Sequence, residues 1–408
     1  MRLADSRDLA VYLGSRLAGT LGVSTQSVAI GWQIYSRTGD MLDLAWVGLA
    51  QFVPLALLSL FAGNVADRYD RKRILVLSRG LFGVGSLALA ALSFLPELGV
   101  TPVYGVLVFL GATRAFAAPA SWALLPALVS PERLPRAIAM SSTTFQIATI
   151  AGPSLGGFIY ALGGPVSAYV AAAAFELVAV ALLAAIRREL PRHEAPAEKG
   201  MTLLLSGVRY VWREKILLGA ISLDLFAVLL GGAVGLLPVF ASDVLRVGET
   251  GFGMLRSAPA VGAALMAILL ALRPISRRAG WWMLACVAIF GVATIVFGLS
   301  KSFALSLGAL VVLGAADMVS VVIRQSIVQL STPDEMRGRV SSVNMIFIGA
   351  SNELGDFESG ATAALFGEPP VGAIRAVVVG GVGTLLVTGL WSALFPELRR
   401  AEAVNKSS

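Results

Sequence analysis

Long apolar runs recur from one end of the chain to the other. Of its 408 residues 57% are hydrophobic and 14% charged, whereas soluble domains carry about 25% charged residues. Many of the runs exceed the roughly 20 residues that a helix needs to cross a bilayer. Backbone polar groups in lipid must be satisfied within the protein, and runs of this length suit helices better than the shorter strands of barrels. The sequence therefore predicts an all-α, multi-pass membrane protein.

The apolar runs divide into about twelve predicted spans. The first six are 9–36, 42–66, 74–95, 102–129, 137–162 and 166–187. The second six are 215–240, 251–272, 281–300, 303–330, 339–366 and 372–396. A hydrophilic stretch separates the two sets, so we expect an N-terminal six-helix half at 1–187, a central linker at 188–214 and a C-terminal six-helix half at 215–408.

Lysine and arginine are concentrated in the connectors that follow the even-numbered spans. These connectors hold Arg68, Arg71, Lys72, Arg73, Arg133, Arg136, Arg273, Arg277, Arg278, Arg337 and Arg339, together with the basic stretch 187–215. Cytoplasmic loops carry such an excess, so both termini and the linker are predicted to be cytoplasmic, in a cell inner membrane. This topology accounts for the net charge of +7, and the sequence predicts no nucleic-acid partner and no cleavable signal peptide.

A short internal repeat connects the two predicted halves. Residues 124–142 resemble residues 326–344 at a constant offset. The aligned pairs are Leu128 with Leu330, Ser130 with Thr332, Pro131 with Pro333 and Glu132 with Asp334. Two repeated halves indicate a transporter whose substrate path lies near the bilayer midplane, between the halves.

The segment "GNVADRYDRKR" (63–73) resembles the loop signature of the major facilitator superfamily. Gly63, Asp67, Arg68 and Arg71 fall on its positions, whereas Asp70 stands where the pattern usually has glycine. The resemblance implies that Asp67 lies near the N-terminus of the eleventh span, where the helix dipole favours an anion, and acts as a latch for one conformational state. The alternative is a basic loop that only fixes topology.

A second segment, "IAGPSLGG" (150–157), is similar to the glycine-proline motif of the superfamily's antiporters. Gly152, Pro153, Gly156 and Gly157 match it, and Ala148 replaces an earlier glycine. The resemblance implies a seal against a leak path, while tight packing of small residues is an equal alternative.

Three further stretches resemble the subfamily of the enterobactin exporter and related drug efflux proteins. They are 28–40, 223–241 and 347–360. The resemblance therefore extends over nearly the whole chain, and it implies efflux by alternating access more firmly than any particular cargo.

Charged residues inside a membrane span are costly and mark functional sites. The predicted proton-coupling candidates are Asp224, Asp317, Glu353, Asp356 and Glu358. Glu353 and Asp356 are three residues apart and share a helical face, whereas Glu358 points elsewhere. Clustered carboxylates in a low dielectric repel one another, so we expect some of them to take up and release protons near neutral pH.

A second group of polar residues inside the spans could line the substrate path. Its members are Arg16, Gln26, Gln33, Arg114, Glu176 and Asn352. Arg114 resembles the arginine of the superfamily's fourth-helix motif and could stabilise an anionic cargo. For the charged members the alternative is a static ion pair between helices, and for the amides a structural hydrogen bond.

The sequence lacks the residues that other classes of function require. There is no G-x-x-x-x-G-K-[ST] loop for an ATP-driven pump, and one histidine with one cysteine is too few for a conventional zinc site. We therefore expect no enzyme, cofactor or metal. The sequence predicts a monomeric, proton-coupled exporter, surrounded by lipid, of a small molecule such as a siderophore or drug. The alternatives are an exporter or flippase of another metabolite or lipid and, more distantly, a non-transporting receptor or scaffold.

Overall fold

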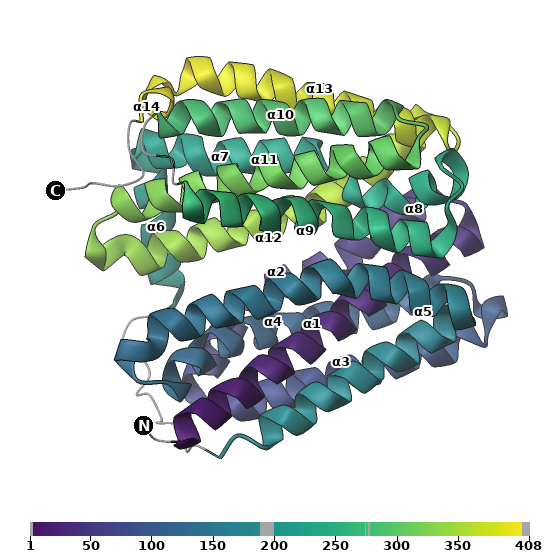
Figure 1. The fold of residues 1–408 in the computed structure, drawn as a ribbon, viewed down its shortest axis with the longest axis horizontal. Helices are drawn as coiled ribbons and strands as arrows, with labels where there is room; N and C mark the ends of the chain where they lie inside the picture. Colours follow the sequence, from purple (N-terminus) through teal and green to yellow (C-terminus); the bar gives the residue numbers. More distant parts are fainter. Residues whose placement is uncertain (1–2, 188–199, 274, 276–277, 402–408) are drawn as a thin grey trace. The chain divides into compact units, whose positions relative to one another are not determined.

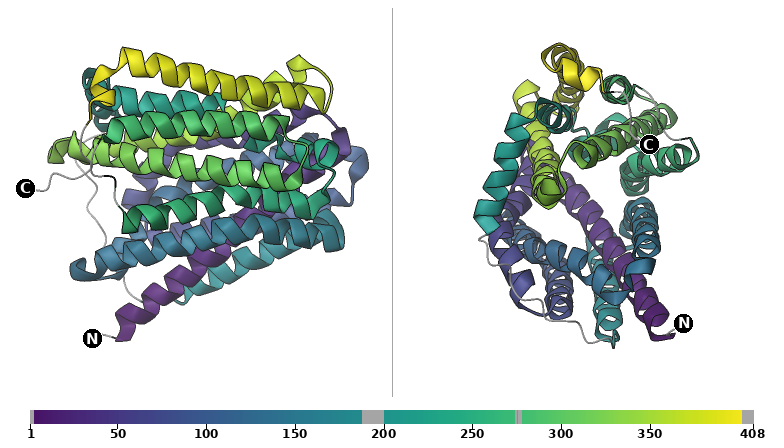
Figure 2. Two further views of the ribbon diagram at one scale, coloured as in Figure 1. Left: turned by 45° about the horizontal axis from the view of Figure 1, so that its top comes forward. Right: turned by 90° about the vertical axis from the view of Figure 1, so that its left-hand side faces the viewer.

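The computed structural model describes residues 3–187, 200–273, 275 and 278–401. Helices make up the fold of these residues, as the apolar runs predicted (Figures 1 and 2). The helices are α1 (Leu3–Thr38), α2 (Met41–Arg68), α3 (Arg71–Ser93), η1 (Pro96–Leu98), α4 (Thr101–Leu128), η2 (Pro131–Arg133), α5 (Leu134–Ala184), α6 (Gly200–Arg213), α7 (Lys215–Leu230), η3 (Val234–Leu236), α8 (Leu237–Val239), η4 (Phe240–Val244), α9 (Gly248–Leu272), α10 (Ala279–Leu299), α11 (Phe303–Leu330), α12 (Asp334–Phe366), α13 (Val371–Leu394) and α14 (Pro396–Arg399).

Nine segments of the described chain are long and apolar enough to cross a membrane. One of them is α5, whose 51 residues cover two predicted spans. Helices α1 and α12 have sufficient length but fall outside this set, and both carry many polar residues. The prediction of a helical multi-pass membrane protein is confirmed, while the count of twelve spans and the cytoplasmic termini stay predictions.

The chain forms two compact units. Unit 1 comprises Met1–Arg37, Leu49–Gly200 and Gly248–Ser257, and unit 2 comprises Thr38–Gly48, Met201–Val247 and Ala258–Ser408. In unit 1, α3 packs against α4 and α5, and in unit 2, α10 packs against α11 and α13. The division passes through α2 and α9, and the simpler division into halves at 1–187 and 215–408 stays a prediction.

The internal repeat marks matching helix ends. Helices α4 and α11 each have 28 residues. They end at Leu128 and Leu330, which the repeat places opposite each other. The Ser130 hydroxyl in the turn after α4 hydrogen-bonds Glu132 and lowers the pKa of that exposed carboxyl.

Two glycine-rich segments interrupt the long helices. The first lies in α5, at the predicted boundary between two spans. Gly163 leaves the helical region there, and Gly164 has a φ of 71°. Glycine adopts such a conformation at little cost. The second differs from the prediction of one continuous span at 215–240. Helix α7 ends at Leu230, and the segment continues as the short helices η3, α8 and η4.

Gly231 caps α7 at this second break. A Cβ atom at Gly231 would lie 2.6 Å from the ring of Phe290, so this position has no room for a side chain. The break therefore coincides with close packing of α7 against α10.

Helix α6 was not predicted, because it lies in the stretch that composition marks as a hydrophilic linker. The Tyr210 hydroxyl donates to Ser331 O at 3.3 Å, and Arg339 Nη1 donates to Ser206 Oγ at 3.2 Å. These bonds attach α6 to the turn between α11 and α12 and to the start of α12. The remainder of the predicted linker, 188–199, lies outside the described residues.

Candidate functional site

A cavity of about 260 Å³ lies within unit 1, between α1, α3, α4 and α5. Three arginines line it: Arg16 from α1, Arg79 from α3 and Arg114 from α4. Its apolar lining includes Tyr12, Val23, Leu75, Phe82, Phe145 and Leu183. No acidic side chain is among the described residues that line it. A space of this composition suits a small ligand that carries negative charge and an apolar or aromatic body.

Arg16 is the lining residue with the clearest spare capacity for a ligand. Its guanidinium carbon lies 5.2 Å from the centre of the Phe145 ring, within the range of a cation–π contact. Its Nε is buried and has no hydrogen-bond partner in the described structure. A buried guanidinium donor without a partner is costly, so an acceptor on a ligand would satisfy it.

Helices α1 and α3 contact each other at intervals of seven residues along unit 1. Gln26 Nε2 donates to Ser86 Oγ at 2.8 Å, and Gln33 Nε2 donates to Ser93 Oγ at 2.9 Å. Seven residues earlier on both helices, a Cβ atom at Gly19 would lie 2.5 Å from the guanidinium carbon of Arg79. Seven residues make nearly two helical turns, so these pairs lie on one seam.

Gln26 and Gln33 therefore fit the alternative of structural hydrogen bonds. Gln33 Oε1 also accepts the hydroxyl of buried Tyr169 at 2.7 Å, and neither glutamine is among the cavity-lining residues. Their role in a substrate path stays a prediction.

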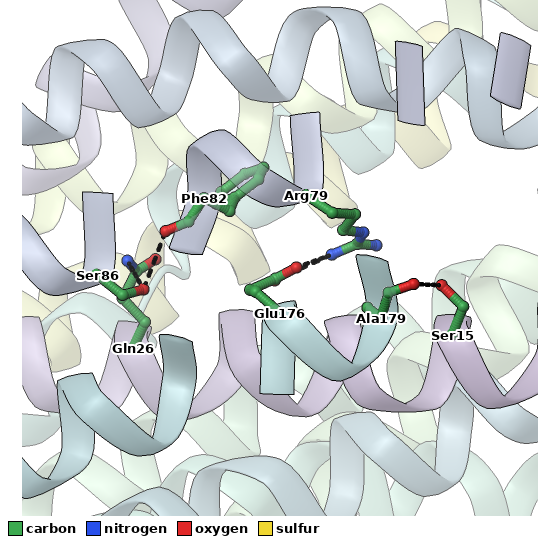
Figure 3. A network of polar contacts seen from close by, with 7 residues as sticks. All are labelled: Ser15, Gln26, Arg79, Phe82, Ser86, Glu176 and Ala179. Carbon is green, nitrogen blue, oxygen red and sulfur yellow. Dashed lines mark hydrogen bonds and ion pairs between the residues drawn. The ribbon is translucent and has the colours of Figure 1, made fainter. Parts of the chain in front are cut away.

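Glu176 pairs with Arg79 beside the cavity (Figure 3). Arg79 Nη1 lies 3.1 Å from Glu176 Oε1, and the two side chains are 18% and 2% exposed. Gly22 and Gly83 make room for the glutamate between the helices. Between α1 and α5, Ser15 Oγ donates to Ala179 O at 2.9 Å. Glu176 thus holds one of the three cavity arginines in place.

Sequence reasoning did not select Arg79. The residue falls near the beginning of a predicted span, directly after a basic loop, so it was not singled out as an intramembrane charge. Arg79, Ser86 and Ser93 follow one another at seven-residue intervals, and this spacing is a signal that could have identified Arg79.

A second polar site lies in unit 2, where α7 and α11 bring Asp224 and Arg324 together. The two form an ion pair between Asp224 Oδ1 and Arg324 Nη1, with side chains 8% and 2% exposed. Asp317 lies on α11, and it lines a small cavity together with Asp224. Two of the five predicted proton-coupling candidates are thus brought into one pocket.

The structure does not bring Asp356 or Glu358 into this pocket. Asp356 of α12 lies against Gly235, which belongs to the broken end of α7. Glu358 accepts a hydrogen bond from Thr362 of its own helix at 2.8 Å. Asn352 is exposed, and the side chain of Glu353 lies outside the described part of the structure.

The glycine-proline motif places α5 in very close contact with two other segments of unit 1. A Cβ atom at Gly156 would lie 2.8 Å from Thr25 Cα, and one at Gly152 would lie 2.5 Å from Ser24 Cβ, both in α1. A Cβ atom at Gly157 would lie 2.4 Å from Glu249 O at the start of α9. Pro153 lies in the same stretch of helix. The motif thus forms a tight seam, and its role as a seal in an antiporter stays a prediction.

The basic loop caps two helices. Asp70 precedes α3, and its side chain accepts bonds from the backbone amides of Lys72 and Arg73. Lys72 Nζ donates to Ala184 O and Ile186 O, at the end of α5. The aspartate that replaces the usual glycine is therefore an N-cap.

The side-chain surroundings of Asp67 and Arg68, and those of Gly63, lie outside the described part of the structure. These residues form the last turns of α2. The latch therefore stays a prediction.

The family profile described as "Major Facilitator Superfamily" matches residues 13–355. The chain belongs to the major facilitator superfamily, a family of transporters rather than enzymes. It is 30% identical over 396 residues to the enterobactin exporter EntS of Shigella boydii serotype 18, covering 96% of this chain and 91% of that one. The same figures hold for the enterobactin exporter EntS of Escherichia coli O1:K1.

Solved structures agree on the fold. A bacterial homolog of the human lysosomal transporter Spinster has a TM-score of 0.75 at 14% identity, covering 98% of this chain and 99% of that one. A POT family transporter in complex with 5-aminolevulinic acid has a TM-score of 0.76 at 12% identity, with 96% of each chain covered. A bacterial homologue of the iron transporter ferroportin has a TM-score of 0.70 at 17% identity, covering 98% of this chain and 100% of that one.

Proposed function

We propose that the chain exports a small organic anion across the cell inner membrane in exchange for protons. The observation that carries this proposal is the cavity of unit 1, where Arg16, Arg79 and Arg114 face an apolar and aromatic lining. Guanidinium groups bind carboxylates and phenolates through charge-assisted hydrogen bonds. The cavity therefore favours an anion over the cationic drug that the sequence left open.

The relatives narrow the cargo further. Their printed name, enterobactin exporter, describes transport of a siderophore by those proteins. We propose a catecholate siderophore, or a molecule with a similar acidic aromatic group, as the cargo of this chain. Ligand pockets usually measure about 300–1,000 Å³, so a cavity of about 260 Å³ would take one such aromatic group rather than a whole large siderophore.

The proposed driving force is the proton gradient. The acids Asp224 and Asp317 lie in the predicted membrane region of unit 2, and a carboxylate there is costly unless it is paired or protonated. Protonation from one side of the membrane and release to the other would bias the alternation of two states. Asp67 would act on the same equilibrium as the proposed latch.

Uptake into inside-out membrane vesicles tests the proposal. A labelled catecholate siderophore and a labelled cationic dye are compared under an imposed inside-acid gradient. We expect the catecholate to accumulate, and the accumulation to collapse when a protonophore is added. Gradient-dependent uptake of the dye alone would contradict the proposed cargo, and catecholate uptake that persists undiminished without the gradient would contradict the proposed coupling.

A further inference from the structure

A very small cavity lies between α7, α10 and α11 in unit 2. Its volume is about 10 Å³, close to the minimum of about 10–15 Å³ for a single water molecule. The polar residues that line it are Asp224, Asp317 and Ser320, and its apolar lining comes from Ala227, Val228, Val287, Phe290 and Ala316. Asp317 lies at the middle of α11, a segment apolar enough to cross a membrane.

The carboxylates at this cavity differ in their partners. Asp224 is paired with Arg324, a residue that is only 1% exposed. Asp317 has no hydrogen bond or ion pair in the described part of the chain. Ser320 is 2% exposed, and its hydroxyl is buried without a partner. A carboxylate and a hydroxyl without partners thus share a space of the size of one water molecule.

The surrounding charges favour a proton over a metal ion at this place. Asp317, Ser320 and Arg324 occupy positions i, i+3 and i+7 of α11, and therefore one face. Helix α10 contributes only Val287 and Phe290, while Asp356 of α12 lies against Gly235 instead. The guanidinium already bound to Asp224 would repel a metal cation, and the cavity is too small for a hydrated one.

We infer that Asp317 is the group that binds and releases the coupled proton, and that Arg324 stabilises its ionised form. In the protonated state Asp317 is a neutral acid and Arg324 is paired with Asp224, so the site carries no net charge. When the proton leaves through the water-sized cavity, a carboxylate remains on Asp317 and the site becomes negative. Arg324 can then share its charge, because its Nε is buried without a partner. This assignment deepens the proposed proton coupling and rests on it.

The first test does not need the cargo. Infrared difference spectra between acidic and alkaline pH are recorded for the purified protein in lipid nanodiscs. We expect the band of a protonated carboxylic acid in the wild type, loss of the Asp317 component of this band in Asp317→Asn, and retention of that component in Glu97→Gln, an acid-to-amide change at an exposed position in η1. We also expect Arg324→Gln to move the titration of the band to higher pH, because the ionised form loses its cation. An unchanged band in Asp317→Asn would overturn the inference.

The second test separates this inference from the proposed function. In vesicles, Asp317→Asn is expected to retain exchange of labelled for unlabelled catecholate but to lose accumulation driven by the gradient. Glu97→Gln should retain both. If the wild type shows no gradient-driven uptake, the proposed coupling fails whatever Asp317 does. If the wild type and Asp317→Asn accumulate the catecholate equally, the coupling stands and the assignment of the proton to Asp317 is wrong.

Discussion

At the scale of single residues, the ion pair between Arg79 and Glu176 contributes to the stability of the fold and holds one of the cavity arginines in place. Replacing Arg79 by glutamine leaves a carboxylate that is only 2% exposed without its cation. We expect Arg79→Gln to lower the free energy of unfolding by about 3 kcal/mol, the lower end of the range for a broken buried pair, since Arg79 is itself partly exposed. Thermal unfolding of the purified protein in detergent measures the loss.

The double variant Arg79→Gln with Glu176→Gln is the matched control, because it removes both charges and leaves hydrogen-bonding side chains of similar volume. It should unfold close to the wild type. The penalty of the single variant should also shrink as the pH falls, because a protonated Glu176 is neutral and needs no cation. Equal losses in the single and double variants at every pH would show that packing, and not the ion pair, sets the stability here.

At the scale of helices, the seam of α5 with α1 depends on the absence of a side chain at Gly156. A Cβ atom there would lie 2.8 Å from Thr25 Cα, and backbone cannot move away cheaply. We expect Gly156→Ala to destabilise the protein by about 1–3 kcal/mol through overpacking. Melting temperatures in detergent measure the effect.

Gly105 of α4 offers the control, because a Cβ atom at this position meets nothing within 4 Å. Gly105→Ala should be neutral or slightly stabilising, since alanine is the better helix former. The account of the seam would be wrong if Gly156→Ala melted at the same temperature as Gly105→Ala.

Some of these elements could be predicted from local sequence signals, and others depend on tertiary contacts. Length and hydropathy were enough to predict the long apolar helices, and the predicted boundary between 137–162 and 166–187 coincides with the bend in α5 at Gly163 and Gly164. The break after Leu230 was not predicted, because "GGAVG" (231–235) is also compatible with a continuous helix, and the close approach of Phe290 is a tertiary contact. Helix α6 was missed because it is polar enough to resemble a linker.

The site was predicted only as a list of polar residues at membrane depth. Spacing along a helix shows which residues share a face, but it does not show which helix packs against that face. The pairing of Glu176 with Arg79 and that of Gln26 with Ser86 therefore could be identified only from the structure. Arg16 and Arg114 were predicted for the substrate path, and the structure brings both to one cavity.

At the scale of the whole molecule, the proposed latch at Asp67 concerns the balance between conformational states. A carboxylate at a helix N-terminus stabilises the conformational state that contains this contact by about 0.3–1 kcal/mol. Its loss should therefore change the equilibrium constant between the two states about two- to fivefold. We expect Asp67→Asn to change the initial rate of catecholate uptake by this factor without changing the affinity for the catecholate. Asp70→Asn, which keeps the N-cap of α3, should transport at the wild-type rate. Wild-type rates for both variants would contradict the latch.

The central claim is that the three-arginine cavity of unit 1 binds the cargo as an anion. Calorimetric titration of a catecholate siderophore into the purified protein tests it most directly, with Arg16→Gln compared with Arg133→Gln at the exposed last residue of η2. Losing a hydrogen bond to a charged group costs about 1.5–3 kcal/mol, so Arg16→Gln should bind about 10- to 100-fold more weakly. Arg133→Gln should bind as the wild type does. Equal affinities for all three proteins would contradict the account.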